Sequence, residues 1–225
     1  MFANIKNSID FFIRNNTKFS RKNYVQDDLD LLKRNRQENI YIKELLSEVF
    51  QQSEKASLQI LDIGCKNWFY VRGEYFYFEE FCKEFTLDGV EVDAYRLYNN
   101  LYSRYEVAKY YMQGLQNVNY IADNLLNINK KYDYIIWMLP FVIKSPHKKW
   151  GLPDSLFYPE KLLAHAYALL NQGGQMLIVN QGESEAEVQK SLLDKLQIPY
   201  EYLGEVKTKS FEYNYKRFGF LINKN

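Results

Sequence analysis

Five short apolar runs recur along the chain between residues 58 and 181, and polar or glycine-containing segments separate them. They are LQILDIG (58–64), FTLDGVEVD (85–93), NVNYIAD (117–123), KYDYIIWMLPF (131–141) and QMLIVNQ (175–181). Nearly continuous apolar runs of this length are typical of strands that are buried on both faces of a sheet. We therefore predict five buried strands.

Segments with a helical pattern separate these runs. They cover residues 74–85, 94–115, 124–130 and 159–170, and another, 184–196, follows the fifth run. Strands that alternate with helices form βαβ units and a parallel sheet, so the expected fold class is α/β. Two further strand-like segments, 199–208 and 216–224, have no room for a helix between them, so we expect them to pair as an antiparallel hairpin.

Residues 1–56 have a polar, helical pattern. The second half of this segment carries an apolar stripe made of Leu29, Leu32, Ile40, Ile42, Leu45, Leu46 and Val49. Such a stripe predicts an amphipathic helix. We therefore divide the chain into an N-terminal helical extension, 1–56, and one α/β domain, 57–225. The extension is either a cap packed on the domain or a lid over a substrate, and the pattern favours the cap.

The composition is that of a globular protein that can bury a real core. Apolar residues make up 47% and aromatic residues 17%, and the net charge is +1. A chain with so little net charge has no general attraction to nucleic acid or anionic lipid. The first residues lack the apolar core of a signal peptide, and no stretch is long enough to span a bilayer, so we expect no membrane association.

The cysteines and histidines form no recognisable cluster. Cys65 and Cys82 stand outside any metal-binding spacing, and His147 and His165 are the only histidines, so we expect no metal site. The absence of a disulfide pattern is typical of a reducing compartment, and we expect a cytoplasmic protein.

Acidic residues and a glycine stand where the first three predicted strands end. Asp62 and Gly64 close the first strand, Glu91 the second and Asp123 the third. In open parallel sheets, ligands bind at the carboxyl ends of the strands. A glycine there lets the backbone turn under a ligand without a clashing Cβ. These residues therefore predict one binding site at this edge.

The order of elements, with Asp62-Ile63-Gly64, Glu91 and the turn Gly173-Gly174, resembles the class I S-adenosylmethionine-dependent methyltransferases over about residues 58–225. The resemblance implies a seven-stranded, mostly parallel Rossmann-like sheet, with helices on both faces and an antiparallel C-terminal hairpin. It also implies S-adenosylmethionine as the cofactor. The residues that it assigns to this cofactor are Asp62, Gly64, Cys65, Lys66, Asn67, Glu91, Val92, Asp123, Asn124, Trp137 and Met138.

In that family, successive acidic residues hold the methionine amino group, the ribose hydroxyls and the adenine amino group. The resemblance gives these roles to Asp62, Glu91 and Asp123. Two alternatives remain open: Glu91 as a mere strand-end charge, and Asp123 as the N-cap of the segment 124–130. Asp93 is expected to cap the helix that follows the second strand.

The first loop departs from the family pattern. Lys66 stands where the family has its second glycine, and Asn67 follows it. Because asparagine tolerates left-handed backbone angles better than most residues, we expect Asn67 to take over part of the turn. A cation is unfavourable near the sulfonium, so the Lys66 ammonium should point to solvent, or pair with Asp62 or with the cofactor carboxylate.

The segment after the fourth strand is expected to form the acceptor side. It begins Met-Leu-Pro-Phe and lacks the polar Asn/Asp-Pro-Pro-aromatic clamp of enzymes that methylate exocyclic amino groups, which counts against a nucleobase or glutamine acceptor. We expect residues 140–158 to form a shaped loop in which Phe141, His147 and Trp150 border the acceptor cleft, with the N-terminal helices opposite. His147 is either a general base or a solvated loop residue, and its charged neighbours favour the second.

The sequence thus predicts a methyltransferase for a small organic acceptor, and leaves nucleic acid and protein acceptors open. No catalytic triad is expected, because methyl transfer depends on alignment of donor and acceptor and on exclusion of water. The alternative is a non-catalytic S-adenosylmethionine- or nucleotide-binding or scaffold protein on the same fold, which the lost second glycine favours. The pattern determines neither the acceptor atom nor the oligomeric state.

Overall fold

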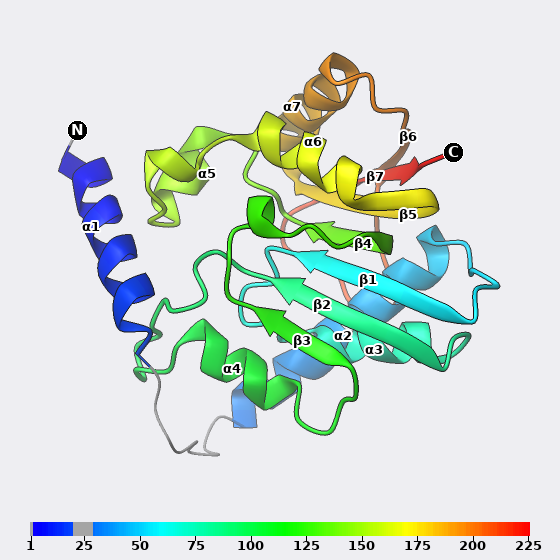
Figure 1. The fold of residues 1–225 in the computed structure, drawn as a ribbon, viewed down its shortest axis with the longest axis horizontal. Coiled ribbons are helices and arrows are strands. Elements are labelled where there is room, and N and C mark those ends of the chain that lie inside the picture. Colours follow the sequence, from blue (N-terminus) through cyan, green and yellow to red (C-terminus); the bar gives the residue numbers. More distant parts are fainter. Residues whose placement is uncertain (1, 20–28) are drawn as a thin grey trace.

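Seven strands form one sheet at the centre of the structure, in the order β3-β2-β1-β4-β5-β7-β6 (Figure 1). This computed structural model describes residues 2–19 and 29–225, without the side chains of residue 2 and of residues 29–34. The strands are β1 (Ser57–Ile63), β2 (Glu84–Val90), β3 (Val118–Ile121), β4 (Tyr132–Met138), β5 (Leu170–Gln181), β6 (Glu201–Glu205) and β7 (Arg217–Asn223). Pairing is parallel from β3 to β5, and β7 is antiparallel to both β5 and β6. The predicted seven-stranded sheet with its antiparallel hairpin is confirmed.

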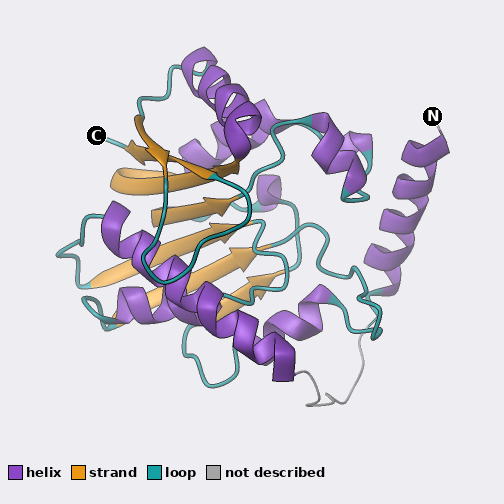
Figure 2. Ribbon diagram, turned by 180° about the vertical axis from the view of Figure 1, so that it is seen from behind, coloured by secondary structure: helices purple, strands orange, loops and turns teal. Residues whose placement is uncertain are grey.

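Helices cover both faces of this sheet, as Figures 1 and 2 show. α2 (Leu29–Val49), α3 (Val71–Glu79) and α4 (Arg104–Tyr111) pack on one face. α6 (Pro159–Leu169), α7 (Gly182–Lys195) and a 3-10 turn (Leu125–Asn127) pack on the other. α1 (Phe2–Thr17), α5 (Lys144–Lys149) and a second 3-10 turn (Asp154–Leu156) lie beyond the carboxyl ends of the parallel strands. Within the described ranges, no helix combines the length and the apolar character needed to cross a membrane.

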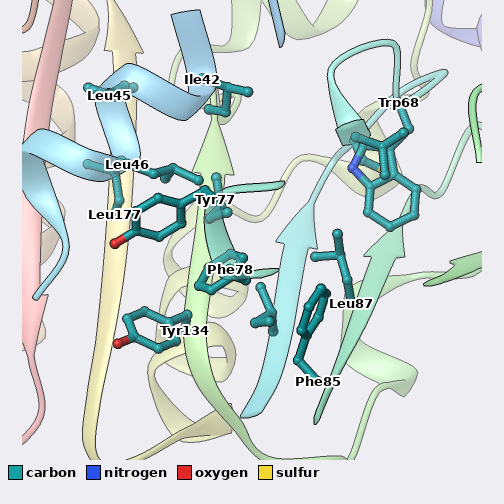
Figure 3. Close-up of a cluster of buried hydrophobic side chains, with 14 of the residues drawn as sticks. Ile42, Leu45, Leu46, Trp68, Tyr77, Phe78, Phe85, Leu87, Tyr134 and Leu177 are labelled. Atoms are coloured by element: carbon teal, nitrogen blue, oxygen red, sulfur yellow. The ribbon is translucent and has the colours of Figure 1, made fainter. Parts of the chain in front are cut away.

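The core between α2, α3 and the sheet is built from interlocking aliphatic and aromatic side chains (Figure 3). Leu45 and Leu46 of α2 are buried together with Tyr77 and Phe78 of α3. The Phe78 ring lies 5.2 Å from the Tyr134 ring of β4. Because each fully buried side chain of this kind stabilises the fold by about 1.5–3 kcal/mol, α2 is an integral part of the core. The domain boundary after residue 56 stays a prediction.

α1 lies apart from the sheet, beside the segment around α5 (Figure 1). Asn7 Nδ2 donates to the Leu152 carbonyl at 3.2 Å, and Asn4 Oδ1 accepts the Asp154 amide at 2.8 Å. Large apolar side chains of α1 are exposed at Ile5, Ile9, Phe12 and Ile13. Hydrogen bonds therefore contribute more to the position of α1 than apolar packing does.

The helix predicted at 94–115 is wrong in its first half. Residues 94–103 form turns, and only Arg104–Tyr111 is helical. The Arg104 amide donates to the Arg96 carbonyl at 3.0 Å, and the Tyr105 amide to the Ala94 carbonyl at 2.8 Å. These bonds fold the segment back on itself, and Ser103 caps the shortened helix. The local helical pattern is overridden by backbone bonds that close turns.

Two other predicted helices differ in extent. The one predicted at 74–85 is observed as Val71–Glu79, because β2 already begins at Glu84. The segment 124–130 contains only the 3-10 turn Leu125–Asn127. Short helical patterns between closely spaced strands thus overestimate helix length.

α2 and α3 come close together at Gly73. A Cβ on this residue would lie 2.2 Å from the Asn39 carbonyl oxygen and 2.3 Å from a methyl carbon of Ile42. The Gly73 amide donates to Asn39 Oδ1 at 2.6 Å. A glycine without a side chain therefore allows backbone-to-backbone contact between the two helices.

We expect Gly73→Ala to lower the free energy of unfolding by about 2–3 kcal/mol, because the added methyl group overpacks this contact. Urea unfolding followed by circular dichroism measures the change. Ser47→Ala, on the exposed side of α2, is the control and should change stability by less than about 0.5 kcal/mol. Equal stability of the two variants would contradict the close approach.

Candidate functional site

A cavity of about 640 Å³ opens at the carboxyl edge of the sheet. Its walls come from the ends of β1, β2, β4 and β5, the start of β7, α2, and the segment around α5. The predicted site residues that line it are Gly64, Lys66, Glu91, Val92, Asp123, Asn124, Trp137, Met138, Phe141, His147 and Trp150. The structure therefore brings together residues from every predicted motif. Asp62, Cys65 and Asn67 are not among the lining residues.

The loop after β1 turns through three left-handed residues. Gly64, Lys66 and Trp68 have φ of 70°, 59° and 47°. Lys66 thus adopts a backbone angle that suits glycine, at a cost of about 1–2 kcal/mol. Asn67 is not left-handed, so the prediction that it takes over the turn is wrong. Lys66 and Trp68, on either side of Asn67, adopt the left-handed angles instead.

The indole of Trp68 anchors this loop in the core. It is fully buried, and its Nε1 donates to Glu74 Oε2 at 2.8 Å. A Cβ on Gly89 of β2 would lie 2.8 Å from the indole ring. The glycine in the strand therefore leaves the room that the tryptophan needs.

Two carboxyl groups, Asp62 before this loop and Glu74 after it, are fully buried. Neither oxygen of Asp62 has a hydrogen-bond partner among the described residues. Burial raises the pKa of Asp62 well above its usual range, and the charge of Glu91 raises it further. Burial and the nearby Asp62 raise the pKa of Glu74 in the same direction. The pair therefore binds protons more readily than exposed carboxyl groups do.

Glu91 joins the end of β2 to the loop after β1. Its Oε2 accepts the Lys66 amide at 3.0 Å, and its Oε1 accepts the Asp93 amide at 2.7 Å. The Arg104 guanidinium lies 3.6 Å from Oε1. Because a carboxylate oxygen can accept two hydrogen bonds, Glu91 keeps acceptor capacity for a ligand in the cavity. It therefore has a structural role at the strand end and remains able to bind a ligand.

Asp93 does not cap a helix, contrary to the prediction. Its buried carboxylate meets three guanidinium groups, with Arg14 Nε and Arg96 Nε each at 2.5 Å and Arg104 Nη1 at 3.4 Å. Arg14 belongs to α1, so Asp93 links α1 to the end of β2. Because Arg14 lies far from Asp93 in the sequence, the pattern around Asp93 gave no sign of the full cluster.

Asn124 caps the turn after β3, and Asp123 does not. Asn124 Oδ1 accepts the Leu126 amide at 3.0 Å. The exposed Asp123 accepts the side-chain amide of Asn127 at 2.7 Å. The alternative that made Asp123 the N-cap is therefore wrong, and Asp123 stands at the cavity wall as a hydrogen-bond acceptor.

Trp150 lies at the end of the cavity nearest to β1 and β2. Its ring is 5.2 Å from Lys66 Nζ and 5.1 Å from the Arg104 guanidinium, and Lys66 Nζ is also 5.8 Å from the Phe69 ring. These distances are in the range of cation–π attraction. The ammonium of Lys66 therefore lies over aromatic rings.

His147 is buried, so the expectation of a solvated loop residue is wrong. It belongs to α5, a short helix inside the segment predicted as a loop. Its ring lies 5.7 Å from that of Phe141 and 5.2 Å from that of Phe157, and neither ring nitrogen is hydrogen-bonded within the described part of the chain. Burial lowers the pKa of His147, against the opposing charge of Asp154. Burial among these rings thus favours the neutral form of the imidazole.

The end of the cavity opposite Trp150 contains residues that the sequence analysis did not identify. They are Tyr41 of α2, Gln181 at the end of β5, Gln189 of α7 and Arg217 at the start of β7. Arg217 lies opposite Gln181 in the sheet register. Because β7 is antiparallel to β5, its first residue must lie where β5 ends. The predicted hairpin therefore already contained the signal that places Arg217 at this edge.

The two N-terminal helices differ in their relation to the cavity. α2 lines it through Glu38, Tyr41 and Ile42, whereas none of its described lining residues belongs to α1. The expected opposite wall is therefore formed by α2 alone.

Thiol and metal chemistry find no support at this edge. Cys65 is fully buried, and burial raises the pKa of its thiol. A protonated, buried thiol is a poor nucleophile. Within residues 2–19 and 29–225, no three His, Cys, Asp or Glu side chains are grouped so as to hold a metal ion.

Glu74→Gln should stabilise the protein at neutral pH. The pKa of Glu74 is higher in the folded state than in the unfolded state. Such a carboxyl group lowers the stability of the protein as the pH rises from the unfolded-state pKa, about 4, through the folded-state pKa. Glutamine keeps an oxygen for the Trp68 indole and cannot ionise. We expect the variant to gain about 1 kcal/mol or more in unfolding free energy at pH 8, and little at pH 4.

Urea unfolding at several pH values measures this difference. Glu187→Gln, on the exposed side of α7, is the matched control and should show no such gain. A Glu74→Gln protein that is less stable than the wild type at pH 8 would show that the fold favours the charged carboxylate.

No protein-family model and no curated protein matches this sequence. Solved structures, however, match nearly the whole chain. A SAM-dependent methyltransferase from Aquifex aeolicus gives a TM-score of 0.59 at 14% identity, with 88% of this chain and 98% of that protein covered. The N-methyltransferase NodS from Bradyrhizobium japonicum gives 0.51 at 13% identity, with 88% and 99% covered.

A third match is the plantazolicin methyltransferase, solved in complex with a monoazolic desmethylPZN analog and SAH. It gives a TM-score of 0.51 at 15% identity, with 99% of this chain and 96% of that protein covered. The chain has the fold of the class I S-adenosylmethionine-dependent methyltransferases.

Proposed function

We propose that the protein is an S-adenosylmethionine-dependent methyltransferase that acts on a small organic acceptor in the cytoplasm. One observation carries the proposal. Gly64, Glu91 and Asp123, which follow β1, β2 and β3, all line a single cavity in a fold whose solved relatives are methyltransferases. A binding site at the carboxyl ends of parallel strands is the usual one in such sheets. Both cysteines are free, which agrees with a reducing compartment.

The residues of the cavity fit this cofactor. A Cβ on Gly64 would meet no atom within 4 Å, so the backbone is open toward the cavity. Glu91 retains acceptor capacity that suits the vicinal hydroxyls of a ribose. Asp123 and Asn124 offer an acceptor and a donor for the adenine edge. Asp62 and Asn67 lie outside the cavity, and we propose that they support the loop from behind.

S-adenosylmethionine would supply an electrophilic methyl group on a sulfonium. The chain's own contribution is to hold the acceptor in line with that methyl group and to exclude water. Met138, Leu139 and Pro140 continue β4 along the cavity wall and provide apolar surface for this purpose. Phe141, His147 and Trp150 border the acceptor space in this proposal. A cavity of about 640 Å³ has the size of a small-molecule site.

The lost second glycine is compatible with turnover. Lys66 has the left-handed angle that a glycine would adopt, so the loop keeps its path. A non-catalytic binding protein remains the alternative, and calorimetry followed by an activity screen separates the two. We expect binding of both S-adenosylmethionine and S-adenosylhomocysteine, and release of the latter with a library of small organic acceptors. Binding without product in any acceptor pool would favour the non-catalytic alternative.

Glu91→Ala should weaken S-adenosylhomocysteine binding by about 1–3 kcal/mol, because hydrogen bonds to a charged acceptor are lost. Titration calorimetry measures the affinity, and thermal unfolding verifies that the loop change leaves the fold intact. Glu84→Ala, at the other end of β2, is the matched control and should bind like the wild type. Unchanged affinity in a folded Glu91→Ala protein would exclude Glu91 as the ribose ligand.

Lys66→Gly should preserve or improve cofactor affinity. The substitution relieves the left-handed strain and leaves the backbone amide that donates to Glu91. Calorimetry with S-adenosylmethionine compares the two proteins. Lys83→Gly, an exposed residue directly before β2 and outside the cavity, controls for loss of a lysine. A loss of affinity beyond about tenfold, or 1.4 kcal/mol, would show that the ammonium contacts the ligand.

A further inference from the structure

Arg217 is a buried cation at the end of the cavity opposite Trp150. Its side chain lies at the first position of β7, and the residue is 8% exposed. Nη1 donates to Gln181 Oε1 at 2.7 Å, and the guanidinium lies 4.6 Å from the centre of the Tyr213 ring. Gln181 and Tyr213 thus fix the plane of the guanidinium group.

No carboxylate forms an ion pair with this cation within the described part of the chain, although the charge of Glu185 acts on it. Two acidic residues, Glu38 and Glu185, also line the cavity, yet neither makes an ion pair with Arg217. Glu185 Oε2 accepts the Gln181 amide at 3.0 Å, so it caps the start of α7. A buried charge without an ion-pair partner is unfavourable, which favours an anion from outside as a further ligand.

Two uncharged donors accompany Arg217. The Tyr41 hydroxyl and Gln189 Nε2 are buried and have no hydrogen-bond partner among the described residues. Both residues line the same cavity. Burial raises the pKa of Tyr41 to about 12, so the hydroxyl keeps its proton and can donate it in a hydrogen bond. A guanidinium with donors beyond its bond to Gln181, a hydroxyl and an amide therefore gather at one end of the cavity.

We propose that this end of the cavity, with Arg217 at its centre, binds a carboxylate of the substrate. The proposal deepens the function proposed above, on which it rests, because it makes the methyl acceptor a small organic acid. Arg217 offers the planar fork of donors that matches a carboxylate, and Tyr41 and Gln189 supply further hydrogen bonds. The apolar residues between the two ends, Met138, Leu139 and Phe141, suit the body of such an acid.

The other cations of the cavity do not compete for this role. Lys66 and Lys149 also line the cavity, and neither is buried. Arg104, which lies near Trp150 but is not a lining residue, is paired with Asp93 and Glu91. Among the described lining residues, Arg217 is therefore the only buried cation. An acid bound to Arg217 extends along the end of β4 toward the β1 loop.

The test compares aryl carboxylates with their neutral amides. Benzoate, phenylacetate and 3-phenylpropionate, and the corresponding amides, are titrated into the wild type by calorimetry, once alone and once with S-adenosylhomocysteine. We expect at least one carboxylate to bind about tenfold more tightly than its amide, and Arg217→Met to remove that preference, since about tenfold corresponds to one charge-assisted hydrogen bond. Arg72→Met, on α3 and outside this cavity, is the matched control.

Carboxylates that bind no better than their amides, or that bind equally well to Arg217→Met, would overturn the proposal. Glu185→Gln gives an independent test in case Arg217→Met does not fold. Removal of this negative charge should tighten carboxylate binding about twofold or more, and weaker binding would overturn the proposal as well. Failure of the wild type to bind S-adenosylhomocysteine would instead contradict the proposed function. The carboxylate site would still be tested in that case, because the carboxylates are also titrated without S-adenosylhomocysteine.

Discussion

Parallel pairing of the first five strands brings the strand-end groups of the candidate site to one edge. Strands that run in one direction end at one edge, and the backbone groups beyond their last pairs need other partners. Glu91 supplies such partners by accepting the amides of Lys66 and Asp93. The same carboxylate thus closes the strand end and faces the cavity. A structural role and a position on the cavity wall coincide in one side chain, because both arise at the unpaired edge.

The loop after β1 shows how this edge stays rigid despite its unfavourable backbone angles. Lys66 and Trp68 are both left-handed, which costs a few kcal/mol in total. The buried indole of Trp68 offsets part of this cost, because it fills the space above Gly89 and bonds to Glu74. The β2 glycine, the indole and the buried acid therefore form one unit. The path of the loop thus depends on Trp68 and its contacts as well as on Lys66.

Strand order and the location of the edge could be predicted because buried parallel strands have an apolar pattern that few other structures share. The turns at 94–103 could not, since they depend on backbone bonds among residues 94–105 and on the contact between Asp93 and Arg14 of α1, which no local pattern connects. The burial of His147 could not be predicted for a similar reason. Its neighbours in sequence include lysines, whereas its neighbours in space are Phe141 and Phe157. Burial of a polar side chain depends on tertiary contacts, which a sequence pattern does not contain.

The ion pairs near the cavity also involve the N-terminal helix α1. Asp93 holds Arg14 of α1 and Arg104 of α4, and Arg104 in turn lies over Trp150. A movement of α1 would therefore alter the balance of charge around Arg104, next to Glu91. At the opposite end, α2 is part of the core and cannot move without exposing Leu45 and Leu46. α1, whose described residues contact Asp93 without lining the cavity, is thus held mainly by polar contacts, whereas α2, which lines the opposite end, is fixed in the core.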